Sequence, residues 1–374
     1  MPKERRYDLD WLRVMVFGLL ILYHVGMFFV PWGWHIKNNE ISESMRWPML
    51  FINQWRLPIL FVISGMGTRF ALSFRTQQQF LGERTYRLLI PLVFGMLLII
   101  PPQVFVERIV NEQFTGSYWS YFVSGTAFQG IYPQGNFSWH HLWFLPYLLV
   151  YSLAFSGLFV YLRNHPENRL IRWLDKMLQK PRNLYLFIIP LYLAETLMEP
   201  FFPSTHALVG DWFNLVNYGM LFLFGYLLIS VKETFWKSLE AVKGPALVLG
   251  ISGFALLLLI HMFIEDSVVV HFTEGLIKVV NLWSWILVLF AYGAQYLNRQ
   301  SQLLAYCNQA VYPYYILHQT ITIIIAYFLM DLSWSVTWKF FVLTLGTFLV
   351  SGIIYELLIR RIKLLWPFFG LKSR

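Results

Sequence analysis

The sequence has 374 residues, of which 57% are hydrophobic and only 13% are charged, and its mean hydropathy is +0.53. Because soluble domains carry roughly a quarter of charged residues, a soluble fold of this length could not cover so much apolar surface. The 16 Trp and 21 Tyr also favour a membrane protein, since these rings prefer the membrane interface. The one cysteine, Cys307, excludes an intramolecular disulfide and a cysteine-rich metal site.

Apolar segments of spanning length recur along the whole chain. A span needs about 20 mostly apolar residues, and about ten segments meet this need. They are residues 11–31, 48–72, 88–106, 142–162, 183–199, 212–231, 245–264, 276–297, 310–330 and 339–360. The fifth segment is interrupted by Pro190, Glu195 and Glu199. A kink in the third is predicted by Pro91, Pro101 and Pro102. The sequence therefore predicts an all-α, polytopic membrane fold with a single transmembrane domain over residues 1–374.

The net charge of +9 is distributed unevenly along the chain. Most of the 29 Lys and Arg residues lie in the two termini and in the loops after the second, fourth, sixth and eighth segments. The positive-inside rule therefore places both termini in the cytoplasm and predicts an even number of spans. The charge is an orientation signal, which argues against a nucleic-acid partner. The first segment contains Arg13 and no small-residue cleavage site follows it, so we expect a span and not a signal peptide.

Ionisable side chains inside the first span form one stripe. Arg13 and His24 are eleven positions apart, so at about 100° per residue they point the same way, about 16 Å apart along the axis. Asp10 precedes Arg13 by three positions, within reach of an ion pair. Polar groups within a span usually face the bundle interior and mark functional sites. The alternatives are a snorkelling interfacial arginine and a core histidine bonded to a neighbouring helix.

The second span carries Arg56 at a depth similar to that of His24. An arginine at this depth needs an anionic partner or an aqueous cavity. It could bind a carboxylate or a developing oxyanion, and the alternative is a structural ion pair.

Further histidines fall at the outer ends of the spans. Trp34 and His35 follow the first span, and His141 and Trp143 begin the fourth. His318 is the other histidine expected to be buried. No HExxH or similar spacing, Gly-rich phosphate loop or GxSxG elbow occurs, so we predict no metal site. The loop over residues 107–141 could cover a site, contact carbohydrate or simply connect two helices.

Several motifs occur together in the order known from one family. They are Leu9-Asp10-Trp11-Leu12-Arg13 followed by His24, then Phe61-Val62-Ile63-Ser64-Gly65, then Arg84-Thr85-Tyr86-Arg87. Three further stretches resemble one branch of that family, namely Trp34-His35, His141-Leu142-Trp143-Phe144-Leu145 and Leu317-His318. Over residues 5–365 the chain resembles the membrane acyltransferase-three family, and most of all its glucan-succinylating members. We expect any acceptor to be bound by the membrane part alone, without the esterase-like domain that some relatives append.

The resemblance implies a multi-pass protein of a bacterial inner membrane that moves an acetyl or succinyl group from cytoplasmic acyl-CoA to an extracytoplasmic glycan hydroxyl. Arg84, Arg87 and Arg13 would hold the donor phosphates. His24 would act as general base or form an acyl-histidine. The partners implied are acyl-CoA as co-substrate, a glycan or glucan acceptor and membrane lipid, with no tightly bound cofactor.

The remaining polar residues receive supporting roles in this interpretation. Arg56 would stabilise the oxyanion or bind a succinyl carboxylate, and Asp10 would orient Arg13. The acceptor site would be shaped by Trp34, His35, His141 and Trp143. Ser64 and His318 are further buried polar candidates.

A transporter is the competing class. Several helices with buried Arg and His would suit a proton-coupled carrier. Against it, the sequence shows neither a two-half repeat nor a matched pair of broken helices.

Overall fold

The computed structural model describes residues 5–371. Within this range the chain is helical and forms no β-sheet. The α-helices are α1 (Tyr7–Met27), α2 (Glu43–Leu72), α3 (Gln77–Phe94), α4 (Pro101–Val110), α5 (Tyr118–Val123), α6 (Phe144–Asn164), α7 (Arg169–Leu178), α8 (Ile188–Leu197), α9 (Trp212–Ser230), α10 (Lys232–Phe263), α11 (Val268–Tyr296), α12 (Gln302–Leu329) and α13 (Val336–Ile354). The predicted all-α fold is confirmed.

Eight segments between residues 5 and 371 are long and apolar enough to cross a membrane. They are Tyr7–Met27, Glu43–Leu72, Gln77–Val110, His140–Asn164, Trp212–Ser230, Lys232–Phe263, Val268–Tyr296 and Val336–Ile359. The chain is therefore a multi-pass membrane protein. The two other predicted spans correspond to α8, which has only 10 residues, and to α12, which is long but interrupted by polar residues. The count of ten and the cytoplasmic termini stay predictions.

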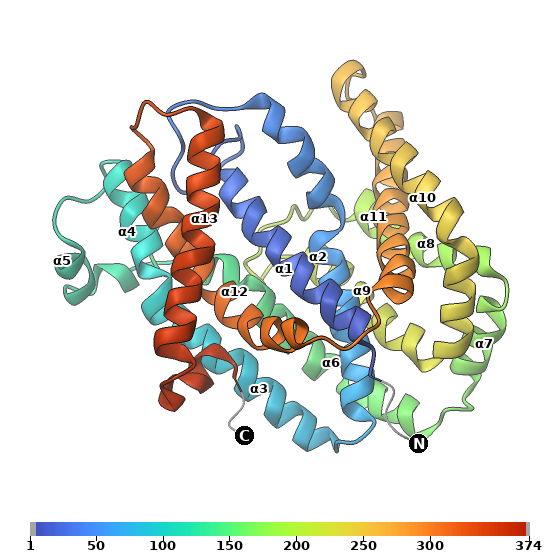
Figure 1. Cartoon of the computed structure of the whole chain (residues 1–374). Helices are drawn as coiled ribbons and strands as arrows, with labels where there is room; N and C mark the ends of the chain where they lie inside the picture. The colour runs from blue at the N-terminus through green and yellow to red at the C-terminus, as the bar shows by residue number, and fades with distance from the viewer. Residues whose placement is uncertain (1–4, 372–374) are drawn as a thin grey trace. The chain divides into compact units, whose positions relative to one another are not determined.

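The described residues form two compact units. Unit 1 draws on Met1–Val16, Asn53–Glu83 and Tyr147–Ser301, and unit 2 on Phe17–Ile52, Arg84–Pro146 and Gln302–Arg374. In unit 1, α10 and α11 lie side by side (Figure 1), and the Asn281 amide donates to the Gly250 carbonyl between them at 2.6 Å. Unit 2 brings together the second half of α1, the helices α4 and α12, and α13.

Side-chain caps set several helix starts. Ser267 accepts a hydrogen bond from the Val270 N–H at the start of α11, and Ser335 accepts one from the Trp338 N–H at the start of α13. Such caps satisfy backbone donors that the first helical turn leaves without partners. These serines therefore define where the two helices begin.

The third predicted span is irregular where its prolines predicted a kink. α3 ends at Phe94, a π-helical turn follows over Gly95–Ile99, and Pro101 and Pro102 begin α4. Proline fits the first turn of a helix because its missing N–H has no partner there. The helix continues to Val110, four residues beyond the predicted end at 106. This extension places Gln103 and Glu107 one turn apart within the helix.

Two lysines fix the loop after α1 within unit 2. Lys37 Nζ donates to the Met27 and Val30 carbonyls at 2.5 and 2.6 Å. Lys339 of α13 is fully buried and donates to Asn38 Oδ1 at 2.7 Å. Burial lowers the pKa of Lys37 to about 8. Since this loop carries Trp34 and His35, the lysines position both side chains.

Within unit 1, α2 and α9 cross with their backbones in close contact. A Cβ at Gly65 would lie 1.9 Å from the Phe222 carbonyl oxygen, and one at Gly225 would lie 2.0 Å from that of Val62. Membrane helices use small residues at such crossings because dispersion contacts hold them together. The family-like motif at 61–65 therefore contains a packing glycine.

Gly65→Ala is expected to lower the free energy of unfolding by about 2 kcal/mol, because the clashing atom belongs to a backbone that cannot move aside. Thermal unfolding in detergent measures this change as a lower Tm. Gly67→Ala is the matched control, since a Cβ there meets nothing within 4 Å. Equal Tm values for the two variants would contradict the close crossing.

Candidate active site

Two histidines from α1 and α12 form a hydrogen-bonded pair in unit 2. His24 Nδ1 lies 2.7 Å from His318 Nε2. The ring planes differ by only 2°, and the centroids are 5.0 Å apart. A short N···N distance with a long centroid separation means that the rings lie edge to edge in one plane, as an in-plane N–H···N hydrogen bond requires. His318 is fully buried, as predicted, and His24 is partly exposed.

The hydrogen-bond partners of His318 show which ring nitrogens of the two histidines carry a hydrogen. Its Nδ1 lies 2.8 Å from the Tyr315 carbonyl oxygen, which can only accept, so Nδ1 carries the hydrogen. In a pair of neutral imidazoles, His318 Nε2 is then an acceptor and His24 Nδ1 is the donor. His24 Nε2 consequently carries the lone pair. A histidine held in this tautomer presents a basic, nucleophilic atom.

A second chain of hydrogen bonds joins α4 to α12. His141 Nε2 donates to the Ile316 carbonyl at 3.0 Å, which leaves Nδ1 as an acceptor facing Gln103 Nε2 at 3.5 Å. The same amide nitrogen donates to Thr320 Oγ1 at 2.7 Å. The His141 ring lies edge-on to His318, with centroids 5.0 Å apart. His141 therefore packs against the histidine pair. Its contact with an acceptor stays a prediction.

His35 forms the outer part of the same unit. Its Nδ1 donates a close hydrogen bond to Glu107 Oε2, and its Nε2 accepts one from Gln319 Nε2 at 3.1 Å. Because Gln319 also donates to Gln103 Oε1 at 3.0 Å, the polar chain runs without a break from Glu107 to His141. Buried polar groups of this kind are costly unless they are satisfied, and here each has a partner.

The sequence analysis missed the residues that link the histidines. Gln103 and Thr320 connect α4 with α12, while Gln319 and Glu107 hold His35. The sequence did contain a signal for them. Glu107 follows Gln103 by four positions in an apolar run, which predicts that the two side chains share one face of a helix. Ending the third span at residue 106 placed Glu107 in a loop and concealed this pattern.

The two predicted acceptor tryptophans lie in unit 2. The Trp34 ring contacts His35 edge-on, with centroids 5.8 Å apart, and Trp143 is buried in the short helical turn before α6. Trp34 is partly exposed and can therefore contact a bound molecule more readily than Trp143. Their role toward an acceptor stays a prediction.

The predicted ion pair of α1 is present in unit 1. Arg13 Nη2 lies 2.9 Å from Asp10 Oδ1, and Arg5 Nη2 lies 2.8 Å from Asp10 Oδ2. Asp10 thus bridges two arginines near the start of the helix. This geometry agrees with a role of Asp10 in orienting Arg13, and the binding of donor phosphates by Arg13 stays a prediction.

Arg84 and Arg87 belong to unit 2 and are partly buried. Arg87 Nε donates to the Gly370 carbonyl at 3.3 Å, and the Arg87 carbonyl accepts from the Tyr312 hydroxyl at 2.9 Å. Arg87 therefore also fastens the end of the chain to α3. The binding of donor phosphates by Arg84 and Arg87 stays a prediction.

Arg56 and Ser64 lie on α2 in unit 1. Arg56 is 5% exposed. Burial, aided by the Arg56 charge and opposed by Asp211, lowers the pKa of His206 to about 4, so this imidazole is neutral at neutral pH. Ser64 is only partly buried, contrary to the prediction, and its hydroxyl donates to the Leu60 carbonyl one turn earlier at 2.7 Å. That bond gives Ser64 a role in its own helix, while oxyanion stabilisation by Arg56 stays a prediction.

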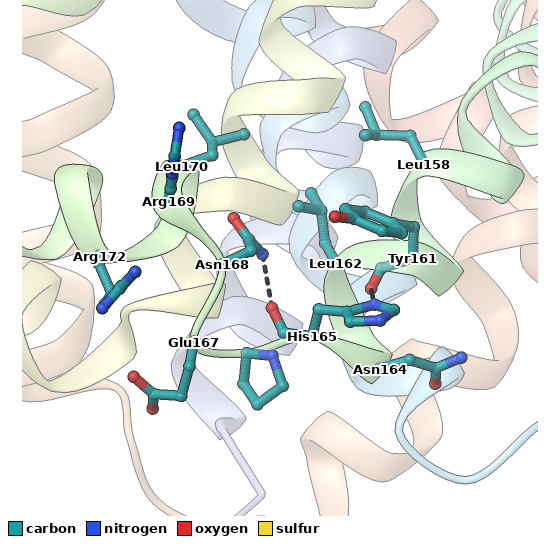
Figure 2. Close-up of a pocket in the computed structure, with 11 residues that line it drawn as sticks. Leu158, Tyr161, Leu162, Asn164, His165, Glu167, Asn168, Arg169, Leu170 and Arg172 are labelled. Atoms are coloured by element: carbon teal, nitrogen blue, oxygen red, sulfur yellow. Dashed lines mark hydrogen bonds between the residues drawn. The ribbon is translucent and has the colours of Figure 1, made fainter.

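A separate surface pocket of about 760 Å³ lies in unit 1 between the end of α6 and the start of α7 (Figure 2). Tyr161, His165, Arg169 and Arg172 are among its lining residues, and the Asn168 amide donates to the His165 carbonyl at 2.5 Å. None of the predicted site residues lines it. The arginines belong to the group of positive residues that predicted a cytoplasmic loop.

Comparison with known proteins identifies the family of this chain. A family model for an acyltransferase domain matches residues 6–356, which is nearly the whole chain. This chain belongs to the acyltransferase-three family. The resemblance predicted from the motifs is confirmed, and the chain is an acyltransferase of a membrane.

Two relatives of this chain share the name glucans biosynthesis protein C. The chain is 25% identical over 340 residues to glucans biosynthesis protein C of Escherichia coli O81 (strain ED1a), which covers 86% of this chain and 83% of the relative. It is 26% identical over 337 residues to the protein of the same name from Shigella dysenteriae serotype 1, with the same coverage. No solved structure gives a significant match.

Proposed function

We propose that this acyltransferase transfers an acyl group, acetyl or succinyl, from acyl-CoA to a hydroxyl of a glycan or glucan outside the cytoplasm, in a bacterial inner membrane. The coplanar His24–His318 pair carries the proposal, because it gives His24 Nε2 a fixed lone pair. The names of the relatives support a glucan acceptor.

The reaction follows from the tautomer of His24. The acceptor hydroxyl attacks the thioester carbonyl while His24 Nε2 takes its proton. His318 keeps accepting the Nδ1 hydrogen of His24 and so stabilises the imidazolium that forms, as the orienting member of a triad does. The tetrahedral intermediate then expels the thiolate of coenzyme A, which receives the proton. The products are the sugar ester and the free thiol, and no further reactant is needed.

Arg84 would bind the phosphates of the donor. Arg84→Gln is expected to raise the KM for acyl-CoA about tenfold while kcat changes little, because a charge-assisted contact remote from the reacting carbonyl contributes equally to ground state and transition state. Thiol release measured over a range of acyl-CoA concentrations gives both constants. An unchanged KM would remove Arg84 from the donor site.

Mass spectrometry of envelope glycans tests the function in cells. Cells that produce the chain should contain glycans with added acyl mass, and cells lacking it should not. Cells with the His24→Gln variant should resemble cells lacking the chain. If the glycans carry the same ester in all three strains, acyl transfer to glycan by this chain is excluded. A transporter would instead change the amount of glycan without changing its mass.

A further inference from the structure

A second polar pocket lies beside α4 in unit 2, within the segment after the third span. It has a volume of about 320 Å³ and is lined in part by Arg108, Gln113, Phe114, Tyr121, Gln134 and Asn136. We call it the Tyr121 pocket. Its volume lies at the lower end of the roughly 300–1,000 Å³ typical of small-molecule sites.

The hydroxyl of Tyr121 lacks a hydrogen-bond partner among the described residues although the side chain is fully buried. A buried hydroxyl without a partner is costly and rare. Burial raises the pKa of Tyr121 to about 12, so at neutral pH the group is a neutral donor and acceptor. A water or a ligand bound in the pocket would give this hydroxyl its partner.

The guanidinium of Arg108 is already occupied by its own loop. Nε donates to Asn136 Oδ1 at 2.9 Å, and Nη2 donates to the Pro133 and Gly135 carbonyls at 2.7 Å each. Nη1 donates to Gln113 Oε1 at 2.5 Å and lies 3.8 Å from Glu107 Oε1. With Glu107 beside it and four of its five N–H donors used within the protein, Arg108 shapes the pocket and does not favour a phosphate.

The groups left to face a ligand are neutral. Because Gln113 Oε1 accepts from Arg108, its amide nitrogen is available as a donor. Gln134 adds an exposed amide, and Phe114 meets Tyr121 edge-on with centroids 5.2 Å apart. Amides and a hydroxyl beside aromatic rings suit a sugar, whose hydroxyls can both donate to and accept from such neutral groups and whose C–H faces pack on rings.

The Tyr121 pocket adjoins the polar chain described above through Arg108, whose Nη1 lies 3.8 Å from Glu107 Oε1. Arg108 directly follows Glu107, whose Oε2 contacts His35 and accepts from the Tyr132 hydroxyl at 3.3 Å. All of these residues belong to unit 2. A molecule in the pocket would therefore lie beside the polar chain that runs to His141.

We propose that the Tyr121 pocket is a subsite for a neutral glycosyl unit of the acceptor, adjoining the unit that receives the acyl group. This inference rests on the proposed function and names the part of the chain that selects the acceptor.

Binding of linear glucose oligosaccharides to the purified full chain, measured by calorimetry without acyl-CoA, tests the proposal. Tyr121→Phe and Gln134→Ala should each weaken binding about threefold to tenfold, as expected for the loss of one hydrogen bond. Tyr121→Phe should not lower Tm, because it removes a hydroxyl that has no partner in the protein. Tyr118→Phe is the matched control, since it removes a hydroxyl from the same short helix outside the pocket.

The outcomes separate the subsite from the function. If acyl transfer proceeds and both variants keep the wild-type KM and affinity for the oligosaccharide, the subsite is wrong while the function stands. If the oligosaccharide binds in a Tyr121-dependent manner but no acyl transfer occurs, the subsite stands and the function fails. Equal losses in Tyr121→Phe and Tyr118→Phe would also overturn the subsite.

Discussion

Replacing His24 with alanine is expected to lower kcat for acyl transfer by a factor on the order of 1,000, within the range seen when a general base is removed. The variant lacks His24 Nε2, the ring nitrogen that takes the proton of the acceptor hydroxyl in the proposed mechanism. Initial rates of thiol release and ester formation in detergent-solubilised protein measure the loss.

His165→Ala provides the control for this experiment. His165 is an exposed histidine whose Nδ1 bonds to the Tyr161 carbonyl of its own helix at 2.9 Å, so its replacement should leave kcat unchanged. The Tm of His24→Ala should stay within a few degrees of that of the wild type, because His24 is partly exposed. A folded His24→Ala protein with full activity would disprove the mechanism.

Replacing His318 is expected to have the second-largest effect. His318→Leu introduces an apolar side chain of moderate size and removes the acceptor for the His24 Nδ1 hydrogen. The tautomer and the ring orientation of His24 are then no longer fixed. We expect kcat to fall on the order of 100-fold, since loss of an orienting partner costs at least this much in serine protease triads. The KM for acyl-CoA should change little.

A conservative variant separates this positioning role from a packing role. In the His318→Gln variant the amide oxygen of the new side chain can accept the same hydrogen bond. This variant should therefore have a much higher kcat than His318→Leu. If His318→Gln and His318→Leu lose the same activity, or if both lose Tm in proportion to activity, His318 serves only to fill space.

Much of this site follows from helical periodicity. The spacing of Asp10 and Arg13 predicted their ion pair. The sequence marked His24 and His318 as polar groups inside apolar segments, and His35 and His141 as histidines at the outer ends of spans. Periodicity says which face of a helix a side chain occupies, but it does not say which helix lies opposite. The in-plane bond between His24 and His318 joins residues 294 positions apart, so only the tertiary structure could reveal it.

The linking residues were missed for a related reason. Hydropathy marks where an apolar run weakens, whereas α4 continues through Glu107 because backbone hydrogen bonds and the partners of the carboxylate sustain it. The same weakness of hydropathy applies to α12. Its 28 residues include Gln319, Thr320 and Thr322, whose side chains are satisfied inside unit 2, so a helix with a central role falls below the apolarity of a typical span.

The most direct test of the account is a single-turnover experiment with the purified chain. Acyl-CoA labelled in the acyl group is mixed with a linear glucose oligosaccharide, and the label is followed by mass spectrometry of both molecules. The account predicts that the wild-type protein moves the label onto a sugar hydroxyl with release of one thiol per ester, and that His24→Gln does not. Label that never reaches the sugar, or that reaches it equally fast in His24→Gln, would contradict it.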